Sequence, residues 1–217
     1  MNSRDLILGR IRDALADNPP VDEPALPEVW PSENPDRETL IGRFSEELQA
    51  VTGETHRCRS MDAAQRKLAE LADEAGWESV GAMDRPLARE VAADLDADSV
   101  RWSDTDRQPE EMGQFAAGLV EADYLLADTG SALVVNNTAQ ERLLCYLPPT
   151  CVVVARADSL AEHLPAVWSE VARRTAEPDR RGEFVIITGP SRTADIEKIL
   201  ILGVHGPKRL VVLIVEA

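Results

Sequence analysis

The stretch CVVVARADSLAEHLPAVWSEVARR, residues 151–174, decides the fold class. Its first five residues are an apolar run without polar alternation, which is typical of a strand buried on both faces of a parallel sheet. Residues 159–162, Ser-Leu-Ala-Glu, have the spacing of a capping box, which favours the start of a helix. The apolar face of that helix consists of residues at helical spacing: Leu160, Leu164, Val167 and Val171. The stretch therefore predicts a buried strand followed by an amphipathic helix.

Strands and helices alternate in the same manner along the rest of the chain. Apolar runs predict strands at 54–59, 78–82, 99–102, 122–127, 131–135, 184–188 and 210–215. Helical spacing predicts helices that end at Gly53 and Gly76, and further helices over 86–95 and 194–201. Because the stronger strands lack alternation and helices separate them, we expect an α/β fold with a mostly parallel sheet flanked by helices.

The N-terminal region differs from the rest of the chain in composition. Residues 4–16 have the spacing of a short amphipathic helix, and six of the 14 prolines lie between Asn18 and Pro35. Proline fixes φ and lacks an N–H, so this stretch is expected to be an extended arm. We expect a helix and proline-rich arm over 1–35 and one α/β domain over 36–217. Such an arm can pack on a neighbouring subunit, so a homo-oligomer is possible, or it can lack a fixed partner.

Charge and hydropathy exclude two classes of partner. The chain has 39 acidic and 23 basic residues, for a formal net charge of −16. A surface of that sign repels phosphate backbones and anionic lipid, so neither nucleic acid nor a membrane surface is expected as a partner. No stretch approaches the roughly 18 apolar residues of a membrane span, and the N-terminus lacks the features of a signal peptide. We therefore expect a cytoplasmic protein without a membrane span.

The three cysteines, Cys58, Cys145 and Cys151, form no Cys-x-x-Cys pair. An odd number argues against a disulfide framework, and the spacing provides no usual ligand set for zinc or an iron–sulfur cluster. We expect buried cysteines, and no metal site or cofactor in this chain.

The first of three polar loops is Asp128-Thr129-Gly130-Ser131, between two predicted strands. Gly130 permits a turn that exposes backbone N–H groups, and Thr129 and Ser131 flank it with hydroxyls. Such a turn can bind an anion or a carboxylate, with Asp128 available for proton transfer. The same residues are also common in ordinary β-turns.

The second loop, residues 189–195, follows a predicted buried strand. Its candidate ligand-binding residues are Gly189, Ser191, Arg192, Thr193 and Asp195. We expect Thr193 to cap a helix and Asp195 to lie in its first turn, an arrangement that can bind phosphate or carboxylate. Arg192 would add a bidentate donor. Alternatively, the loop is only a helix cap.

The third loop, residues 203–207, contains His205 and Gly206. His205 titrates near neutral pH and can act as an acid or base, although a histidine in a turn can also simply bond the backbone. The other two histidines, His56 and His163, are expected on the surface. Because ligands collect beyond the carboxyl ends of parallel strands, we expect the three loops to share a site at one sheet edge.

The strings DYLLADTGSALVV, GPSRTADIEKILILGVHGP and LVVLIV, in that order, resemble the LUD domain and, within it, the lactate-utilization protein C family. The resemblance covers residues 120–217 in motif and the first half in layout. It implies a Rossmann-like fold similar to the NagB, ribose-5-phosphate isomerase and CoA-transferase group. It also implies a role in the oxidation of L-lactate to pyruvate, with iron–sulfur clusters carried by cysteine-rich partner proteins.

Three functions remain open at this stage. The chain is a subunit of a lactate-oxidising system that binds a small carboxylate or phosphate, or it is a stand-alone enzyme acting on a phosphorylated or CoA-linked small molecule. The third possibility is a scaffold or sensor subunit without chemistry of its own. The sequence leaves open whether the chain is catalytic by itself.

Overall fold

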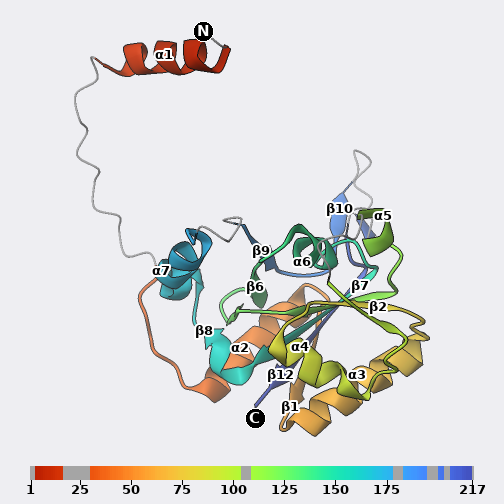
Figure 1. Ribbon diagram of the computed structural model, residues 1–217. Coiled ribbons are helices and arrows are strands. Elements are labelled where there is room, and N and C mark those ends of the chain that lie inside the picture. The colour runs from red at the N-terminus through yellow and green to blue at the C-terminus, as the bar shows by residue number, and fades with distance from the viewer. Residues whose placement is uncertain are drawn as a thin grey trace. The chain divides into compact units, whose positions relative to one another are not determined.

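The computed structural model describes residues 3–16, 30–103, 109–177, 183–194, 200–202 and 206–216. It divides into two compact units, Met1–Pro31 and Ser32–Ala217. The first unit contains helix α1 (Ser3–Leu15), which confirms the helix predicted near the N-terminus (Figure 1). The second unit contains the other elements that are described below.

The main sheet has six strands, and every neighbouring pair is parallel. Its order is β1-β12-β7-β4-β2-β3. The bounds are β1 Glu54–Cys58, β2 Val80–Ala82, β3 Val100–Trp102, β4 Ala117–Glu121, β7 Thr150–Arg156 and β12 Arg209–Val215. The predicted parallel α/β sheet is therefore confirmed, and the stretch that opens at Cys151 supplies one of its central strands.

A second, four-stranded sheet has the order β8-β5-β6-β9. Its strands are β5 Tyr124–Leu126, β6 Ser131–Val135, β8 Leu160–Ala161 and β9 Phe184–Ile187. Strands β5 and β6 form an antiparallel hairpin around residues 128–130. The predicted pair of strands around this turn is confirmed, but it lies outside the parallel sheet.

Helices cover the main sheet on both faces (Figure 1). The longer ones are α2 Arg37–Ala50 and α3 Met61–Ala75, and the short ones are α4 Pro86–Val91, α5 Pro109–Met112, α6 Ala139–Leu144, η1 Ala92–Asp94 and η2 Ala157–Ser159. A further helix, α7 Leu164–Thr175, packs against the second sheet. None of the helices among the described residues is long and apolar enough to span a lipid bilayer.

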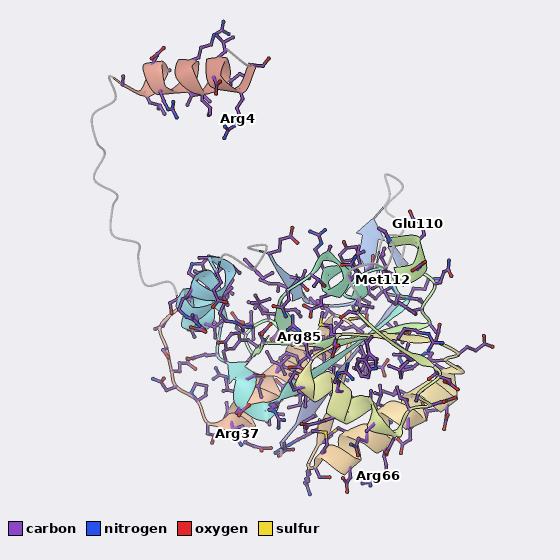
Figure 2. The ribbon with its side chains drawn as sticks, viewed as in Figure 1. Arg4, Arg37, Arg66, Arg85, Glu110 and Met112 are labelled. Carbon is purple, nitrogen blue, oxygen red and sulfur yellow. The ribbon has the colours of Figure 1, made fainter. Side chains whose placement is uncertain are left out.

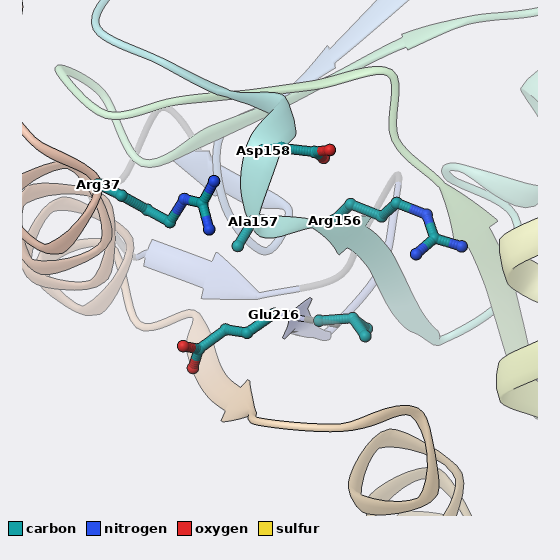
Figure 3. A pocket seen from close by; sticks show the side chains of 6 residues that line it. Arg37, Arg156, Ala157, Asp158 and Glu216 are labelled. Atoms are coloured by element: carbon teal, nitrogen blue, oxygen red, sulfur yellow. The ribbon is translucent and has the colours of Figure 1, made fainter.

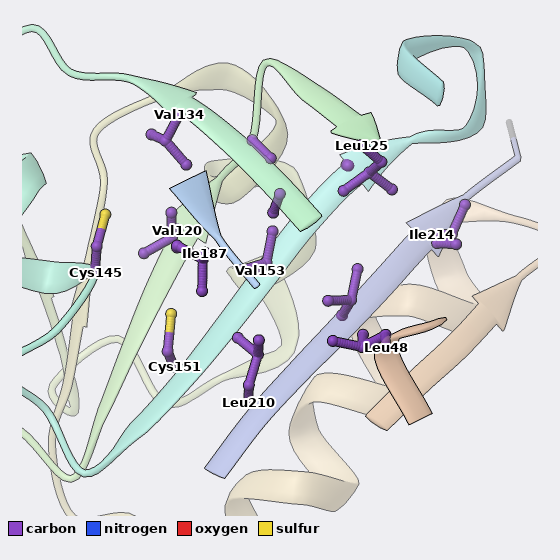
Figure 4. Close-up of a cluster of buried hydrophobic side chains, with 14 of the residues drawn as sticks. Leu48, Val120, Leu125, Val134, Cys145, Cys151, Val153, Ile187, Leu210 and Ile214 are labelled. Atoms are coloured by element: carbon purple, nitrogen blue, oxygen red, sulfur yellow. The ribbon is translucent and has the colours of Figure 1, made fainter. Parts of the chain in front are cut away.

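Two apolar clusters hold the main sheet between its covering layers. Successive residues of β7 belong alternately to one cluster and to the other, because successive side chains of a strand point to opposite faces of the sheet. Val153 packs with Phe44 and Leu48 of α2 and with residues of the second sheet (Figure 4). Val152 packs on the other face, with Leu68 of α3. The unbroken apolar run of β7 is thus explained by burial on both faces.

The helix predicted to begin at the capping box of 159–162 begins later, at Leu164. Leu160 and Ala161 instead form β8, which pairs in parallel with β5. Strand pairing therefore overrides the local helix signal. His163 becomes the N-cap, and its Nδ1 accepts the Ala166 N–H at 3.1 Å. The expectation that His163 lies on the surface is wrong, since it is only 6% exposed.

The prediction of a helix over 194–201 is also wrong at the two ends of this range that the structure describes, residue 194 and residues 200–201. Strand β10 (Arg192–Ala194) pairs antiparallel with β11 (Leu200–Leu202), with Thr193 opposite Ile201. Thr193 therefore lies within a strand and does not cap a helix. Residues 195–199, including Asp195, lie outside the described part of the chain.

An ion pair joins the neighbouring strands β1 and β12 of the main sheet. Arg209 donates from Nε to Glu54 Oε1 at 2.6 Å and from Nη2 to Glu54 Oε2 at 2.8 Å. The hydrogen bonds from Arg209 lower the pKa of Glu54 below its ordinary value of 4.5. A carboxyl whose pKa is lower in the folded state contributes stability above its unfolded-state pKa and loses it as the pH falls through the folded-state value.

We expect Glu54→Gln to reduce the acid sensitivity of the fold. Between pH 7 and about pH 3.5, the free energy of unfolding from urea titrations should fall further in the unchanged protein than in the variant. Glu46→Gln, on the exposed side of α2, is the control. Its free energy of unfolding should fall between pH 7 and about pH 3.5 by as much as that of the unchanged protein. An equal loss in the Glu54→Gln variant and the unchanged protein would contradict this role of the pair.

Candidate functional site

The turn at 128–131 is held closely against helix α2. Gly130 has φ of +60°, and a Cβ atom there would lie 2.3 Å from the backbone nitrogen of Leu48. Only glycine fits, because the turn needs a left-handed residue and the helix backbone occupies the space of a side chain. Asp128 and Thr129 remain exposed beside it, whereas Ser131 is 1% exposed.

Three hydroxyl groups form a row at this turn. Ser131 Oγ lies 2.8 Å from Thr129 Oγ1 and 3.0 Å from Thr188 Oγ1. Thr129 Oγ1 in turn lies 3.2 Å from Asp128 Oδ1. We call Thr129, Ser131 and Thr188 the hydroxyl row. Hydroxyls donate as well as accept hydrogen bonds, so the row can bind the oxygens of a carboxylate or a phosphate.

The described parts of the three polar loops are connected. Thr188 of the hydroxyl row directly precedes Gly189, and two residues further on the Ser191 N–H donates to the Pro207 carbonyl at 2.7 Å. A Cβ atom added at Gly206 would lie 3.0 Å from Ser191 Cβ, so the backbone of Gly206 lies close to the Ser191 side chain. His205 and Asp195, and the side chains of Arg192 and Thr193, lie outside the part of the chain that the structure describes.

The position of this region differs from the expectation of a site at the carboxyl ends of the parallel strands. Pro207 comes just before β12, and the N–H groups of Lys208 and Arg209 donate to the carbonyl of Pro149, just before β7. The third loop therefore lies at the amino ends of β7 and β12. The expectation was wrong because the first loop joins β5 to β6 and the second loop follows β9, all strands of the second sheet, whereas the third loop leads into a strand.

The carboxyl ends of β2 and β4 hold a different polar group of residues. The chain leaves β2 toward β3 and leaves β4 toward β7, in opposite directions, which is where open α/β sheets usually bind ligands. Arg85 lies there and is 8% exposed (Figure 2). Its Nε and Nη2 donate to Glu141 at 3.1 and 2.6 Å, and Nη2 also donates to the Val135 carbonyl at 2.6 Å.

Two further charged residues complete this buried network. Asp123 Oδ2 lies 3.4 Å from Arg85 Nη1 and accepts the Val135 N–H at 2.6 Å, while its Oδ1 lies 2.7 Å from Arg174 Nη1. Burial works against the charged form of Arg85, but the hydrogen bonds that Arg85 donates to Glu141, together with the negative charges of Glu141, Asp123 and Glu121, outweigh it and raise the pKa of the guanidinium. Because the donors of Arg85 are taken up by protein groups, the network is suited to holding β2, β6 and α6 together.

The sequence did not indicate this network. Arg85, Glu141 and Arg174 are far apart in the chain and have no local motif. One signal was present, since Thr138 and Glu141 have capping-box spacing: Thr138 Oγ1 accepts the Glu141 N–H at 3.1 Å at the start of α6.

A small pocket of about 80 Å³ lies at the carboxyl ends of β7 and β12. Figure 3 shows Arg37 from α2 and Arg156 from β7 on either side of Ala157. Asp158 and Glu216 also line it, so its two positive and two negative side chains give no net preference for an anion. Among the described residues, no group of three histidine, cysteine, aspartate or glutamate side chains is placed to hold a metal ion.

The fold is similar to that of a solved structure, a DUF162 family protein from Deinococcus radiodurans. The TM-score is 0.60 with 18% sequence identity, over 83% of this chain and 99% of that chain. At this identity the likeness concerns the fold alone.

Three relatives have similar sequences. Lactate utilization protein C of Halalkalibacterium halodurans is 31% identical over 118 residues, which is 53% of this chain and 51% of that protein. Lactate utilization protein C of Bacillus pumilus is 34% identical over 48% of this chain and 43% of its own length. The chain thus spans about half the length of these two relatives. The uncharacterized protein YkgG of Escherichia coli is 28% identical over 75% of this chain and 71% of its own length.

The family model of the LUD domain matches residues 41–215, which include the main sheet, the second sheet and the three polar loops. Since this match spans most of the 217 residues, the chain belongs to the LUD domain family.

Proposed function

We propose that the chain acts in lactate utilization, as a subunit of an iron–sulfur system that oxidises L-lactate to pyruvate. The proposal is supported by membership of the LUD domain family and by relatives named lactate utilization protein C. The sequence has three cysteines and no Cys-x-x-Cys pair, so the clusters would be carried by cysteine-rich partner proteins.

The ligand of this subunit would be a small carboxylate held at the hydroxyl row. The observation that carries this part is the position of Ser131, which is buried between two other hydroxyls next to the exposed Thr129 and Asp128. The N–H groups of the turn at Gly130 would add donors. His205 or Asp128 would handle protons. The other proposed ligand-binding residues are Gly189, Ser191, Arg192, Thr193, Asp195 and Gly206.

Deletion of the gene in its host tests the role in lactate utilization. We expect the deletion strain to lose growth on L-lactate as sole carbon source and to regain it when the unchanged chain is supplied. The tagged chain should also co-purify with two cysteine-rich proteins. Normal growth of the deletion strain on lactate would refute the proposal. Unchanged growth with both Arg192→Ala and His205→Ala would favour a subunit without chemistry.

Ser131→Ala tests the ligand site directly. Titration of the purified chain with L-lactate, followed by calorimetry at constant ionic strength, should give a dissociation constant about tenfold higher, because a hydrogen bond to a charged group contributes about 1.5 kcal/mol. Ser159→Ala is the matched control: its hydroxyl donates to the Arg156 carbonyl at 2.7 Å, away from the row. Equal affinities of the two variants would remove Ser131 from the site.

A further inference from the structure

Within its own unit, helix α1 leaves four of its five large apolar side chains exposed. The exposed fractions are 42% for Leu6, 56% for Ile7, 50% for Ile11 and 58% for Leu15, and no residue of the helix is buried. An isolated helix of 13 residues is only marginally stable in water, and most helices of this length are stabilised by packing an apolar face. Helix α1 therefore has the properties of a segment that packs against a partner.

The arrangement of residues around α1 defines the packing face. At 100° per residue, Ile7, Leu8, Ile11 and Leu15 fall within an arc of about 100°. Asp5 and Arg12 are seven residues apart, two full turns, and so lie on the same flank of that face. Arg10 lies on the opposite flank.

This charge pattern is complementary to itself in one orientation. In an antiparallel pair related by a two-fold axis, the same flanks of the two helices meet. If Leu8 packs against Ile11 of a second copy, Asp5 comes within about 3 Å, measured along the axis, of Arg12 of that copy, since each residue rises about 1.5 Å. Symmetry makes this contact twice. A parallel pair would lose it, because Asp5 and Arg12 would then lie at opposite ends.

The same pairing explains the position of Arg4. Arg4 projects from the first turn of α1 (Figure 2). At 100° per residue, its direction falls within the arc of the apolar face, between those of Ile11 and Leu15. In the antiparallel pair it would lie beside the last turn of the other helix, where the helix dipole favours a positive charge. One contact is unfavourable: Arg10 would lie opposite Arg10 of the second copy.

We propose that α1 is a self-association element that pairs antiparallel with α1 of a second copy of this chain. The pair would bury less than the roughly 1,200 Å² of a strong interface, so the association is weak and depends on concentration. It needs no change in the second unit, which has its own core.

Sedimentation equilibrium of the full chain, from about 10 to about 500 µM, covers the range expected for so small an interface. We expect a monomer–dimer equilibrium and a helical circular-dichroism signal that rises with concentration. Ile11→Asp should raise the dimer dissociation constant at least about tenfold, because it places a charge in the apolar contact.

The two arginines provide a matched pair of variants with opposite expected effects. Arg12→Gln should raise the dissociation constant about threefold, since two symmetric ion pairs are lost, and Arg10→Gln should lower it about twofold. Arg12→Asp should weaken the dimer further, and adding Asp5→Arg should restore it. A monomer at all concentrations, a dimer insensitive to Ile11→Asp, or a failure of the double charge exchange to restore association would each overturn the proposal.

Discussion

Replacement of Arg85 by methionine is expected to lower the free energy of unfolding by about 3–5 kcal/mol, the usual cost of removing one partner from a buried ion pair. The variant keeps an unbranched side chain but leaves Glu141, which is 4% exposed, without its guanidinium. It also leaves Asp123 with Arg174 as its remaining positive partner and removes the donor to the Val135 carbonyl. Urea denaturation at pH 7 measures the loss.

Arg89→Met is the matched control, because Arg89 lies in α4, about one turn after Arg85, the N-cap residue of that helix. Its Nε pairs with Asp84, its guanidinium lies 4.4 Å from the centre of the Trp102 ring, and both members of the ion pair are about half exposed. We expect a loss of at most about 1 kcal/mol. If the two variants lost the same free energy of unfolding, the buried network would not contribute more to stability than an exposed ion pair.

A second substitution separates buried charge from lost packing. Adding Glu141→Gln to Arg85→Met should recover part of the stability, because the amide removes the buried charge and still offers an oxygen to the Asn137 N–H, which Glu141 accepts at 2.7 Å. A double variant that is less stable than Arg85→Met alone would contradict this explanation.

Gly130→Ala is expected to cost about 2–5 kcal/mol. A residue other than glycine in the left-handed region costs about 1–2 kcal/mol. The rest comes from overpacking, at about 1–3 kcal/mol, because the new methyl group would lie 2.3 Å from Leu48 N and 2.8 Å from the carbonyl carbon of Glu47. Since backbone atoms of α2 are involved, the turn and the helix have to move apart. Thermal and urea unfolding measure the effect.

Gly76→Ala provides the comparison, because Gly76 has almost the same φ, +62°, at the end of α3, and a Cβ atom there would meet nothing within 4 Å. It should cost only the conformational part, about 1–2 kcal/mol. The difference between the two variants therefore measures how firmly the turn is held against α2. Equal costs would mean that the close approach at Gly130 has no energetic weight.

The parallel sheet could be predicted because its central strands are encoded by continuous apolar runs, such as Cys151 to Ala155. Strand β4 was missed, because the apolar run around Leu119 and Val120 continues after a short polar break into β5, and local spacing does not show where one strand ends. The two capping-box sequences show the same limit. Thr138-x-x-Glu141 starts a helix. In 159–162, Ser159 instead ends a 3₁₀-helix and Leu160 and Ala161 form β8, since β5 provides a pairing partner for Leu160.

Residue types predicted part of the candidate site. Asp, Thr, Gly and Ser at 128–131 indicate a turn in which hydroxyls flank a glycine, and the turn is present. Thr188 was missed as a member of the hydroxyl row, because its contact with Ser131 depends on the pairing of β6 with β9, 57 residues away. Arg85 was missed for the same reason: its partners come from β6, α6 and the end of β4.

The hairpin of β5 and β6 has a consequence for how this family can vary in length. Its open end carries Asp123, whose N–H donates to the Leu133 carbonyl, and its closed end carries Ser131 opposite Leu126. Inserting or deleting one residue between these ends would turn every following side chain to the wrong face and would disconnect Asp123 from Val135 and Ser131 from Thr188 together. Gaps in alignments of related chains should therefore avoid residues 123–135 and accumulate elsewhere. The length of this hairpin sets the spacing between the Arg85 network and the hydroxyl row.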